Sequence, residues 1–238
     1  IVLDSVMARR IRAKARLKRD PIIIPPWPHE DVIKRSETRG MKFRKKYGLE
    51  DKFIFMYSGN HSWVHPLDTI LEASKIVESR SDIVFLFVGG GVEKEKIEEA
   101  IRRGAQNIIS LPYQSLDNLG ETLAAADVHF VVMGNDMVGI VHPCKIYGAM
   151  AAGRPILAIT PDESHIAEII DKYKVGMRFR HGDASGVADC ILKLAEMNRE
   201  EIIKMGENSL NTIKKEFSQE ILVKKFLSII EDSIVSSI

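Results

Sequence analysis

The residues best suited to chemistry lie in one stretch, 139–160, where a lysine sits among small residues. Lys145 follows Pro143 and Cys144 at the expected start of a short helix, which Gly153 ends. Proline is favoured in the first helical turn, and glycine just beyond the last turn. A cation in the first turn of a helix is unfavourable, because the helix dipole is positive at that end. A bound anion that contacts both the cation and the free backbone N–H groups would make this position favourable. The stretch therefore predicts an anion site, such as one for a diphosphate, at Lys145.

Two glycine-containing segments could border such an anion, although each also has an ordinary structural explanation. Gly59 and Asn60 suit a tight turn with outward-facing amides, and His61 could donate to a phosphate; a helix-capping turn would use the same residues. Residues 89–91 are three glycines that permit close backbone approach, but such runs are also common between a strand and a helix. The segment lacks the third spaced glycine and the acidic residue of a dinucleotide fingerprint, so an ordinary NAD site is excluded.

A third segment and one histidine complete the candidates for function. Leu111, Pro112 and Tyr113 could present backbone groups and a ring edge to a base, or form a plain loop with a half-buried tyrosine. His142 lies directly before the predicted helix and is the histidine best placed for function. We therefore predict His142 and Lys145 as the catalytic residues.

The composition is that of an ordinary globular protein. The chain has 238 residues, 45% of them hydrophobic, and a net charge of +1, which gives no reason to expect nucleic acid as a partner. Two cysteines, Cys144 and Cys190, indicate no disulfide framework and favour a reducing, cytoplasmic location. No apolar run reaches the ~18–20 residues of a membrane span, and no signal peptide is visible. His61, His65 and Asp68 could look like metal ligands, but Pro66 interrupts the helical spacing of the two histidines, so we expect neither metal nor cofactor. Because the chain begins with Ile1, we expect it to be a piece of a longer protein.

Apolar runs alternate with helical patterns from residue 51 onward. Some of these runs are continuously apolar, as in parallel strands that are covered on both faces. The alternation predicts an α/β fold with a doubly wound, Rossmann-like parallel sheet, in which ligands bind beyond the carboxyl ends of the strands. The predicted strands are 53–58, 83–88, 107–111, 128–133, 155–160 and 177–180. The predicted helices are 66–79, 92–103, 116–126, 143–152, 163–173, 184–196, 199–215 and 218–233.

The N-terminal segment differs in composition from the rest of the chain. Residues 8–19 form a basic run, for which a solvated helix face is the ordinary explanation and a membrane-surface patch the alternative. Few aromatic residues accompany the charges, which argues against stacking on nucleic-acid bases. Residues 22–24 suit a short strand, and the prolines of 25–28 suit a rigid connector. A domain boundary is therefore expected near residues 21–30.

Taken together, these motifs resemble group 1 (family 4) glycosyltransferases, and among them bacterial colanic-acid and O-antigen sugar transferases. The resemblance covers roughly residues 20–235. Its most specific part is the block 143–155, which is similar to the pattern Pro-Ser-Lys-(Ile/Leu)-Tyr followed by Ala-Ala-Gly-(Lys/Arg)-Pro. The other motifs that carry the resemblance are residues 57–60, 87–91, 111–113 and 126–128.

The resemblance implies the C-terminal, donor-binding half of a GT-B fold. Residues 1–26 would then be the end of the acceptor domain and the connector, 27–215 the nucleotide-sugar-binding domain, and 216–238 a helix returning toward the N-terminal domain. The implied activity is that of a hexosyl-type, metal-independent, retaining transferase, inactive as this fragment alone. It would move a sugar from a nucleoside diphosphate to a glycan or lipid-linked acceptor in surface polysaccharide synthesis, as a cytoplasmic protein that could touch the inner membrane face.

The donor site that the resemblance implies departs from the family pattern at two places. Many relatives carry a Glu-x7-Glu pair, whose members would fall near Ile140 and at Gly148 in this chain; Asp136 and Asp162 are the nearest carboxylates that could compensate. Relatives also often place Arg and Lys after the first strand, where this chain has histidines. The implied donor-binding residues are Gly59, Asn60, His61, Gly89, Gly90, Gly91, Leu111, Pro112, Tyr113, Pro143, Cys144, Lys145 and Asp162.

Two other functions remain open on the sequence. A nucleotide-sugar 2-epimerase would share the fold, but it needs acidic and histidine groups that move a proton at the sugar, and none can be assigned. A product assay without acceptor would separate it from a transferase. A non-catalytic nucleotide-sugar-binding module is the other alternative, and the missing glutamate pair is its best support.

Overall fold

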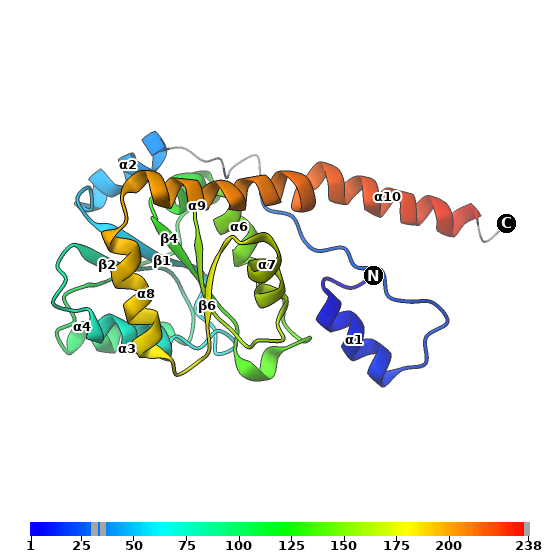
Figure 1. The fold of residues 1–238 in the computed structure, drawn as a ribbon, viewed down its shortest axis with the longest axis horizontal. Helices are drawn as coiled ribbons and strands as arrows, with labels where there is room; N and C mark the ends of the chain where they lie inside the picture. Colours follow the sequence, from blue (N-terminus) through cyan, green and yellow to red (C-terminus); the bar gives the residue numbers. More distant parts are fainter. Residues whose placement is uncertain (30–32, 34–36, 236–238) are drawn as a thin grey trace.

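The computed structural model describes residues 1–29, 33 and 37–235, and it shows a six-stranded parallel sheet between two layers of helices (Figure 1). The strands lie in the order β3-β2-β1-β4-β5-β6, so the sheet is doubly wound around β1 and β4. The strands are β1 (Phe53–Asn60), β2 (Ile83–Gly90), β3 (Ile108–Leu111), β4 (Val128–Val132), β5 (Ile156–Ile159) and β6 (Gly176–Phe179). The helices are α1 (Ser5–Lys14), α2 (Glu37–Tyr47), α3 (Asp68–Ile76), α4 (Lys94–Arg102), α5 (Leu119–Ala124), α6 (Lys145–Ala151), α7 (His165–Tyr173), α8 (Ala184–Glu196), α9 (Arg199–Thr212) and α10 (Gln219–Val235), with shorter turns at Leu116–Asn118, Asn135–Met137 and Ile213–Phe217.

All six predicted strands are confirmed, and β1 and β2 each extend two residues further than predicted. The extension pairs Gly59 with Gly89 and Asn60 with Gly90 in the same parallel register. A Cβ atom at Gly89 would lie 2.0 Å from the carbonyl oxygen of Gly59, and Gly89 has a φ of 140°. The two strands can therefore continue to this point only because Gly89 carries no side chain.

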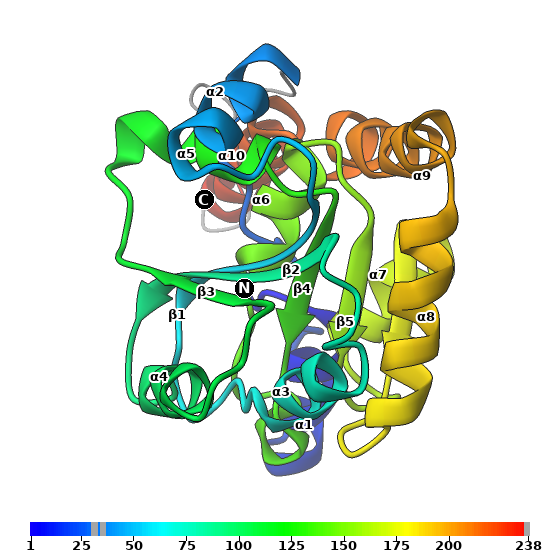
Figure 2. The same ribbon diagram turned by 90° about the vertical axis from the view of Figure 1, so that its left-hand side faces the viewer.

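Helices cover both faces of the sheet (Figure 2), and a hydrophobic core lies on each side of it. Along β1, Met56 points into the core beneath α5, α6 and α7, whereas Phe55 and Tyr57 point into the core beneath α3, α4 and α8. Side chains of a strand alternate between faces, so a strand buried on both faces is apolar throughout. This arrangement explains the continuous apolar runs in the sequence.

Helix α2 is absent from the predicted elements because it has few apolar residues. Its buried positions are Gly40, Phe43 and Arg44, and only one of these is a large hydrophobic residue. Arg44 anchors the helix by donating to the carbonyl of Ala125 at 2.8 Å and to the carboxylate of Asp127 at 2.6 Å. A helix held by a buried ion pair leaves no hydrophobic periodicity in the sequence.

The N-terminal segment is only partly as predicted. Helix α1 ends at Lys14 and Ala15 is extended, so the basic run 8–19 is helical over little more than its first half. The expected strand at 22–24 is a single parallel bridge between Val2 and Ile23. The expected boundaries of the three domains stay predictions. No helix within the described ranges 1–29, 33 and 37–235 is both long and apolar enough to cross a membrane.

Helix α6 begins later than predicted and ends where predicted. Pro143 precedes the helix, Cys144 is its N-cap residue, and Lys145 is its first residue. Gly153 follows the helix with a φ of 69°, a left-handed conformation that glycine adopts without strain. Helix α9 packs on the backbone carbonyl of Gly153 at its residue Gly206, which has no side chain to keep the two backbones apart.

We predict that Gly206→Ala lowers the free energy of unfolding by about 1–3 kcal/mol, the usual cost of an overpacked contact. The added Cβ would lie 2.0 Å from the carbonyl oxygen of Gly153, and neither backbone can give way easily. Gly148→Ala is the matched control, because its Cβ would meet Leu123 at an ordinary 3.6 Å. This control should be neutral or stabilising by up to ~1 kcal/mol, since alanine favours a helix interior. Urea denaturation measures both changes, and equal stabilities would contradict the prediction.

Candidate functional site

A pocket of about 270 Å³ lies beyond the carboxyl end of β1, between α5 and α6. β1 is paired with β2 on one side and β4 on the other, which is the point where the strand order reverses and where open α/β sheets bind ligands. A larger groove, of about 430 Å³, lies between α3 and α4 and touches none of the predicted site residues. The pocket residues are Trp27, Pro28, His29, Ile33, Ser58, Gly59, Leu119, Leu123, His129, Phe130, Cys144, Lys145, Gly148 and Ala149.

The Lys145 side chain crosses the end of β1 and packs on Gly59. A Cβ atom at Gly59 would lie 2.7 Å from Cε of Lys145, so the lysine occupies the space that a side chain would take. Its ammonium group lies 5.2 Å from the centre of the Tyr57 ring, within the range of a cation–π interaction. Within the part of the chain that the structure describes, no carboxylate forms an ion pair with Lys145. Lys145 is thus a half-buried cation that lacks a counterion there.

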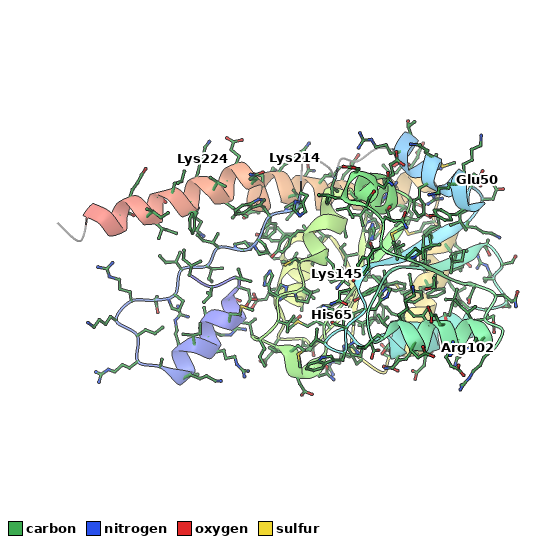
Figure 3. All side chains as sticks on the ribbon, turned by 180° about the vertical axis from the view of Figure 1, so that it is seen from behind. Glu50, His65, Arg102, Lys145, Lys214 and Lys224 are labelled. Atoms are coloured by element: carbon green, nitrogen blue, oxygen red, sulfur yellow. The ribbon has the colours of Figure 1, made fainter. Side chains whose placement is uncertain are left out.

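Burial lowers the pKa of Lys145 to about 8. Burial disfavours the charged form of an ammonium group that has no ion-pair partner, and a bound anion would raise the pKa again by favouring the charged form. Lys145 also affects the nearby His65, whose pKa is lowered to about 4, first by burial and then by the lysine charge (Figure 3). His65 is therefore neutral at neutral pH, and Lys145 carries the positive charge beside it.

The side chain of His61, which was expected to contact a phosphate, does not line the pocket. The side chain is fully buried and stacks on Tyr57 with 5.2 Å between ring centroids. Burial, followed by the charges of Lys145 and Lys94, lowers the pKa of His61 to about 4, so the ring is neutral. Its backbone N–H is also occupied, because it donates to the carbonyl of Gly90 at 2.8 Å.

The other predicted loops meet next to the pocket. The ring of Tyr113 lies over Gly90, where a Cβ atom would be 3.4 Å from the ring, and the Tyr113 hydroxyl donates to the Gly90 carbonyl at 3.1 Å. Gly91 has a φ of 136°, and a Cβ there would lie 2.5 Å from the backbone of His61. The two segments 89–91 and 111–113 therefore lie together beside Gly59; that they border a base stays a prediction.

His142 and Asp162 do not line the pocket, so the expectation that they join Lys145 is not met. Both ring nitrogens of His142 are bonded elsewhere, to Asp4 at 2.7 Å and to the Tyr147 hydroxyl at 2.9 Å. Asp162 is exposed at the β5–β6 edge, where it pairs with Arg178 at 2.6 Å and with Arg180. Each side chain is directed by a partner that is distant in sequence, which explains why spacing alone misplaced it.

The sequence analysis missed the contribution of the connector to the pocket. Trp27, Pro28 and His29 line it together with Ile33, and Trp27 is 41% exposed. The proline cluster indicated a stiff connector, but nothing in its composition indicated that it returns across β1. His129 is buried, with its ring bonded to the Leu123 carbonyl at 2.9 Å, and it too borders the pocket.

Residues 52–197 match the family model of the group 1 glycosyl transferases, which is more than half of the chain. This chain belongs to that family. The match includes Gly59 and Lys145, which both line the pocket. It ends before α9 and begins after the connector, so it does not bear on how the connector residues act.

Individual relatives agree with the family. The probable glycosyltransferase WbjE of Pseudomonas aeruginosa is 26% identical over 231 residues, which are 95% of this chain and 56% of WbjE. Sucrose-phosphate synthase from Thermosynechococcus elongatus superposes with a TM-score of 0.79 at 16% identity, over 99% of this chain and 58% of the synthase. Anabaena HepE in complex with UDP-glucose gives a TM-score of 0.79 at 15% identity, over 95% of this chain and 61% of HepE. These likenesses confirm the fold of this chain, which spans less than two thirds of each relative.

We predict that the affinity of this chain for a nucleoside diphosphate falls as the pH rises through about 8. An anion binds the charged form of Lys145, which is present below its pKa and is lost above it. The last ionisation of a terminal phosphate, near pH ~6, is already complete in this range. Calorimetric titration at several pH values measures the effect. Lys145→Met should bind more weakly and without this step, and an unchanged wild-type affinity across the range would contradict the prediction.

Proposed function

We propose that this chain binds the nucleoside-diphosphate part of a sugar donor at Lys145. The proposal depends on one observation, the half-buried Lys145 that crosses Gly59 with no carboxylate partner in the described part of the chain. Few ligands besides a phosphate or diphosphate would offset the cost of burying that charge. The glycines at the ends of β1 and β2 keep the two strands paired and leave room for the Lys145 side chain beside the pocket.

We further propose that the whole protein transfers the sugar to a glycan or lipid-linked acceptor in surface polysaccharide synthesis, with retention and without a metal. The bond between the anomeric carbon and the phosphate oxygen breaks, the acceptor oxygen bonds to that carbon, and the acceptor hydroxyl loses its proton. The leaving diphosphate gains charge, which Lys145 is placed to stabilise. A positioned donor of this kind is typically worth ~3 kcal/mol in the transition state.

The first donor to test is a UDP-hexose, because HepE, a structural neighbour, was solved with UDP-glucose. We predict that the chain binds one of UDP, GDP, ADP and TDP in a saturable manner, equally with magnesium and with EDTA. Lys145→Ala should weaken that binding by about 1.5–3 kcal/mol, the usual range for a hydrogen bond to a charged group. Lys214→Ala is the control, because this exposed lysine lies outside the pocket. Equal affinity of the Lys145 variant would refute the site.

A non-catalytic binding module is the second candidate, and one observation favours it. Gly148 lines the pocket without a side chain, and Ile140 is 53% exposed, so neither supplies the carboxylate that many relatives have at these places. Turnover of a donor by the full-length protein would exclude this candidate. An epimerase would convert the nucleotide sugar with no acceptor present, whereas a transferase needs the acceptor for sugar transfer.

We also propose that the basic N-terminal segment contacts an anionic membrane surface, near the lipid-linked acceptor. Arg9 pairs with Glu168 and Arg12 with Asp20, but Arg16, Lys18 and Arg19 are exposed beyond the end of α1.

The membrane contact predicts co-sedimentation with phosphatidylglycerol vesicles and not with phosphatidylcholine vesicles. Replacing Arg16, Lys18 and Arg19 together by alanine should weaken the binding by about 1 kcal/mol per charge. A variant with Lys45 and Lys46 of α2 replaced by alanine is the control, since these basic residues lie on another part of the molecule. Equal sedimentation of all three proteins would support the alternative, a solvated helix face.

A further inference from the structure

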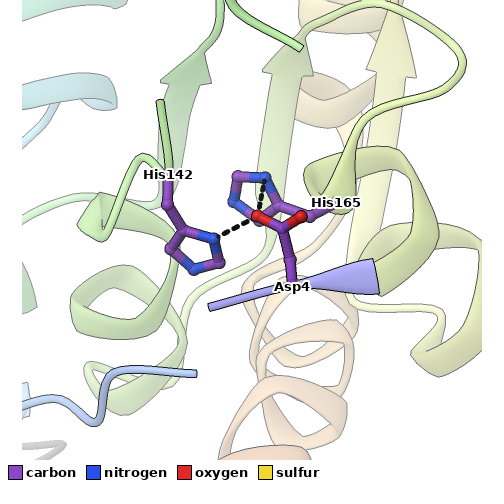
Figure 4. Close-up of side chains that lie close together, drawn as sticks. All are labelled: Asp4, His142 and His165. Carbon is purple, nitrogen blue, oxygen red and sulfur yellow. Dashed lines mark hydrogen bonds and ion pairs between the residues drawn. The ribbon is translucent and has the colours of Figure 1, made fainter. Parts of the chain in front are cut away.

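A buried polar cluster joins α1 to the loop that precedes Lys145 (Figure 4). Asp4 is the N-cap residue of α1, where its Oδ1 accepts the Met7 backbone N–H at 2.7 Å. Its Oδ2 accepts the Nδ1–H of His142 at 2.7 Å. Although burial raises the pKa of Asp4, the bonds from His142 and Met7 keep it below its usual value, so Asp4 is a carboxylate. One side chain therefore caps α1 and holds His142.

His142 and Tyr147 bracket Lys145 in the sequence, and they bond to each other. The Nε2 of His142 lies 2.9 Å from the Tyr147 hydroxyl, within hydrogen-bond distance. Both side chains are buried, and Cys144 adds a contact by donating to the His142 carbonyl at 3.3 Å. The backbone on each side of Lys145 is thus fixed by a bonded residue.

His165 completes the cluster from the first turn of α7. Its ring stacks on His142 with 3.9 Å between centroids and 15° between planes, and its Nδ1 lies 3.7 Å from Asp4. An imidazole nitrogen binds a metal in the plane of its ring, and two stacked rings do not direct their nitrogens to one ion. We therefore interpret the three residues as a packed hydrogen-bonded cluster.

A second contact ties α1 to the same loop. Arg10 donates to the carbonyl of Val138 at 3.5 Å, and its side chain packs on Gly139, where a Cβ would lie 3.2 Å from Cδ of the arginine. The other polar contacts of α1 with the body go to Glu168 of α7, from Ser5 and from Arg9 at 3.2 Å. The loop 138–142 is therefore in contact with the α1 segment at both of its ends, through Arg10 at Val138 and through Asp4 at His142.

From these contacts we infer that Asp4 and His142 are positioning residues for Lys145, and that α1 controls donor affinity through them. This inference rests on the proposed nucleotide site. A shift of α1 moves Asp4, which moves His142 and the backbone that carries Lys145 over Gly59. Coupling is reciprocal, so a bound diphosphate stabilises the contact between Asp4 and His142 in turn.

Asp4 both caps α1 and contacts His142, and two substitutions at Asp4 distinguish the effects of these two contacts on nucleotide affinity. Asp4→Ser keeps an N-cap oxygen but is too short to reach the histidine. Asp4→Asn keeps the cap, and its amide can donate to Nδ1 of the other histidine tautomer. Calorimetry with whichever of UDP, GDP, ADP and TDP the unmodified chain binds should show a loss of about 10-fold for Asp4→Ser and less than about 3-fold for Asp4→Asn.

Glu168→Gln is the matched control, because it weakens the contacts of α1 with α7 and leaves His142 untouched. It should bind nucleotide like the unmodified chain. Wild-type affinity of Asp4→Ser, or an equal loss in Glu168→Gln, would overturn the inference while leaving the nucleotide site intact. Failure of the unmodified chain to bind any of the four nucleotides would overturn the proposed function and this inference with it.

A second measurement does not depend on the variants being folded. Imidazole ¹H–¹⁵N spectra of the unmodified chain report the ring nitrogens of His142, which does not line the pocket. The nucleotide should shift the His142 signals and leave those of His181 unchanged, because His181 bonds to the Met133 carbonyl on another loop. Unshifted His142 signals in a chain that binds nucleotide would overturn the coupling.

Discussion

The structure around the pocket depends on Lys145, whose charged ammonium group is partly removed from water at a cost in free energy. Lys145 is held against Gly59 and the Tyr57 ring, and burial brings its pKa to about 8. The histidines around it are neutral, so they add no further positive charge. A folded protein accepts such a cation more readily where a ligand supplies the missing charge. The pocket is thus complementary to an anion before any anion arrives.

Backbone geometry, more than side-chain chemistry, makes room for that cation. β1 and β2 remain paired to Asn60 and Gly90 only because glycine at position 89 allows the two backbones to approach. Because Gly59 also has no side chain, the Lys145 side chain can pack directly on the backbone there. The two hydrophobic cores on either side of the sheet then hold β1 rigidly, so the end of the strand is a fixed support for Lys145.

The sequence predicts those features that depend on neighbours along the chain. The six strands and the glycine end of α6 follow from apolar runs and turn residues, and the closeness of Gly59 and Lys145 follows from the order of the strands. Features that depend on distant partners could not be predicted. Helix α2 rests on Arg44 and Asp127, His142 is turned by Asp4, and the connector reaches the pocket through Trp27. The contact between Arg44 and Asp127 spans 83 residues and that between Asp4 and His142 spans 138, and neither leaves a periodic signal in the sequence.

The contact between Gly59 and Lys145 has a consequence for genetics. Any side chain at position 59 would occupy the space that now holds the lysine, 2.7 Å from its Cε atom. A mutation at Gly59 would therefore have the phenotype of a lesion at Lys145, and combining the two would add little further damage. The two codons would behave as one locus for donor recognition, although eighty-six positions separate them in the chain.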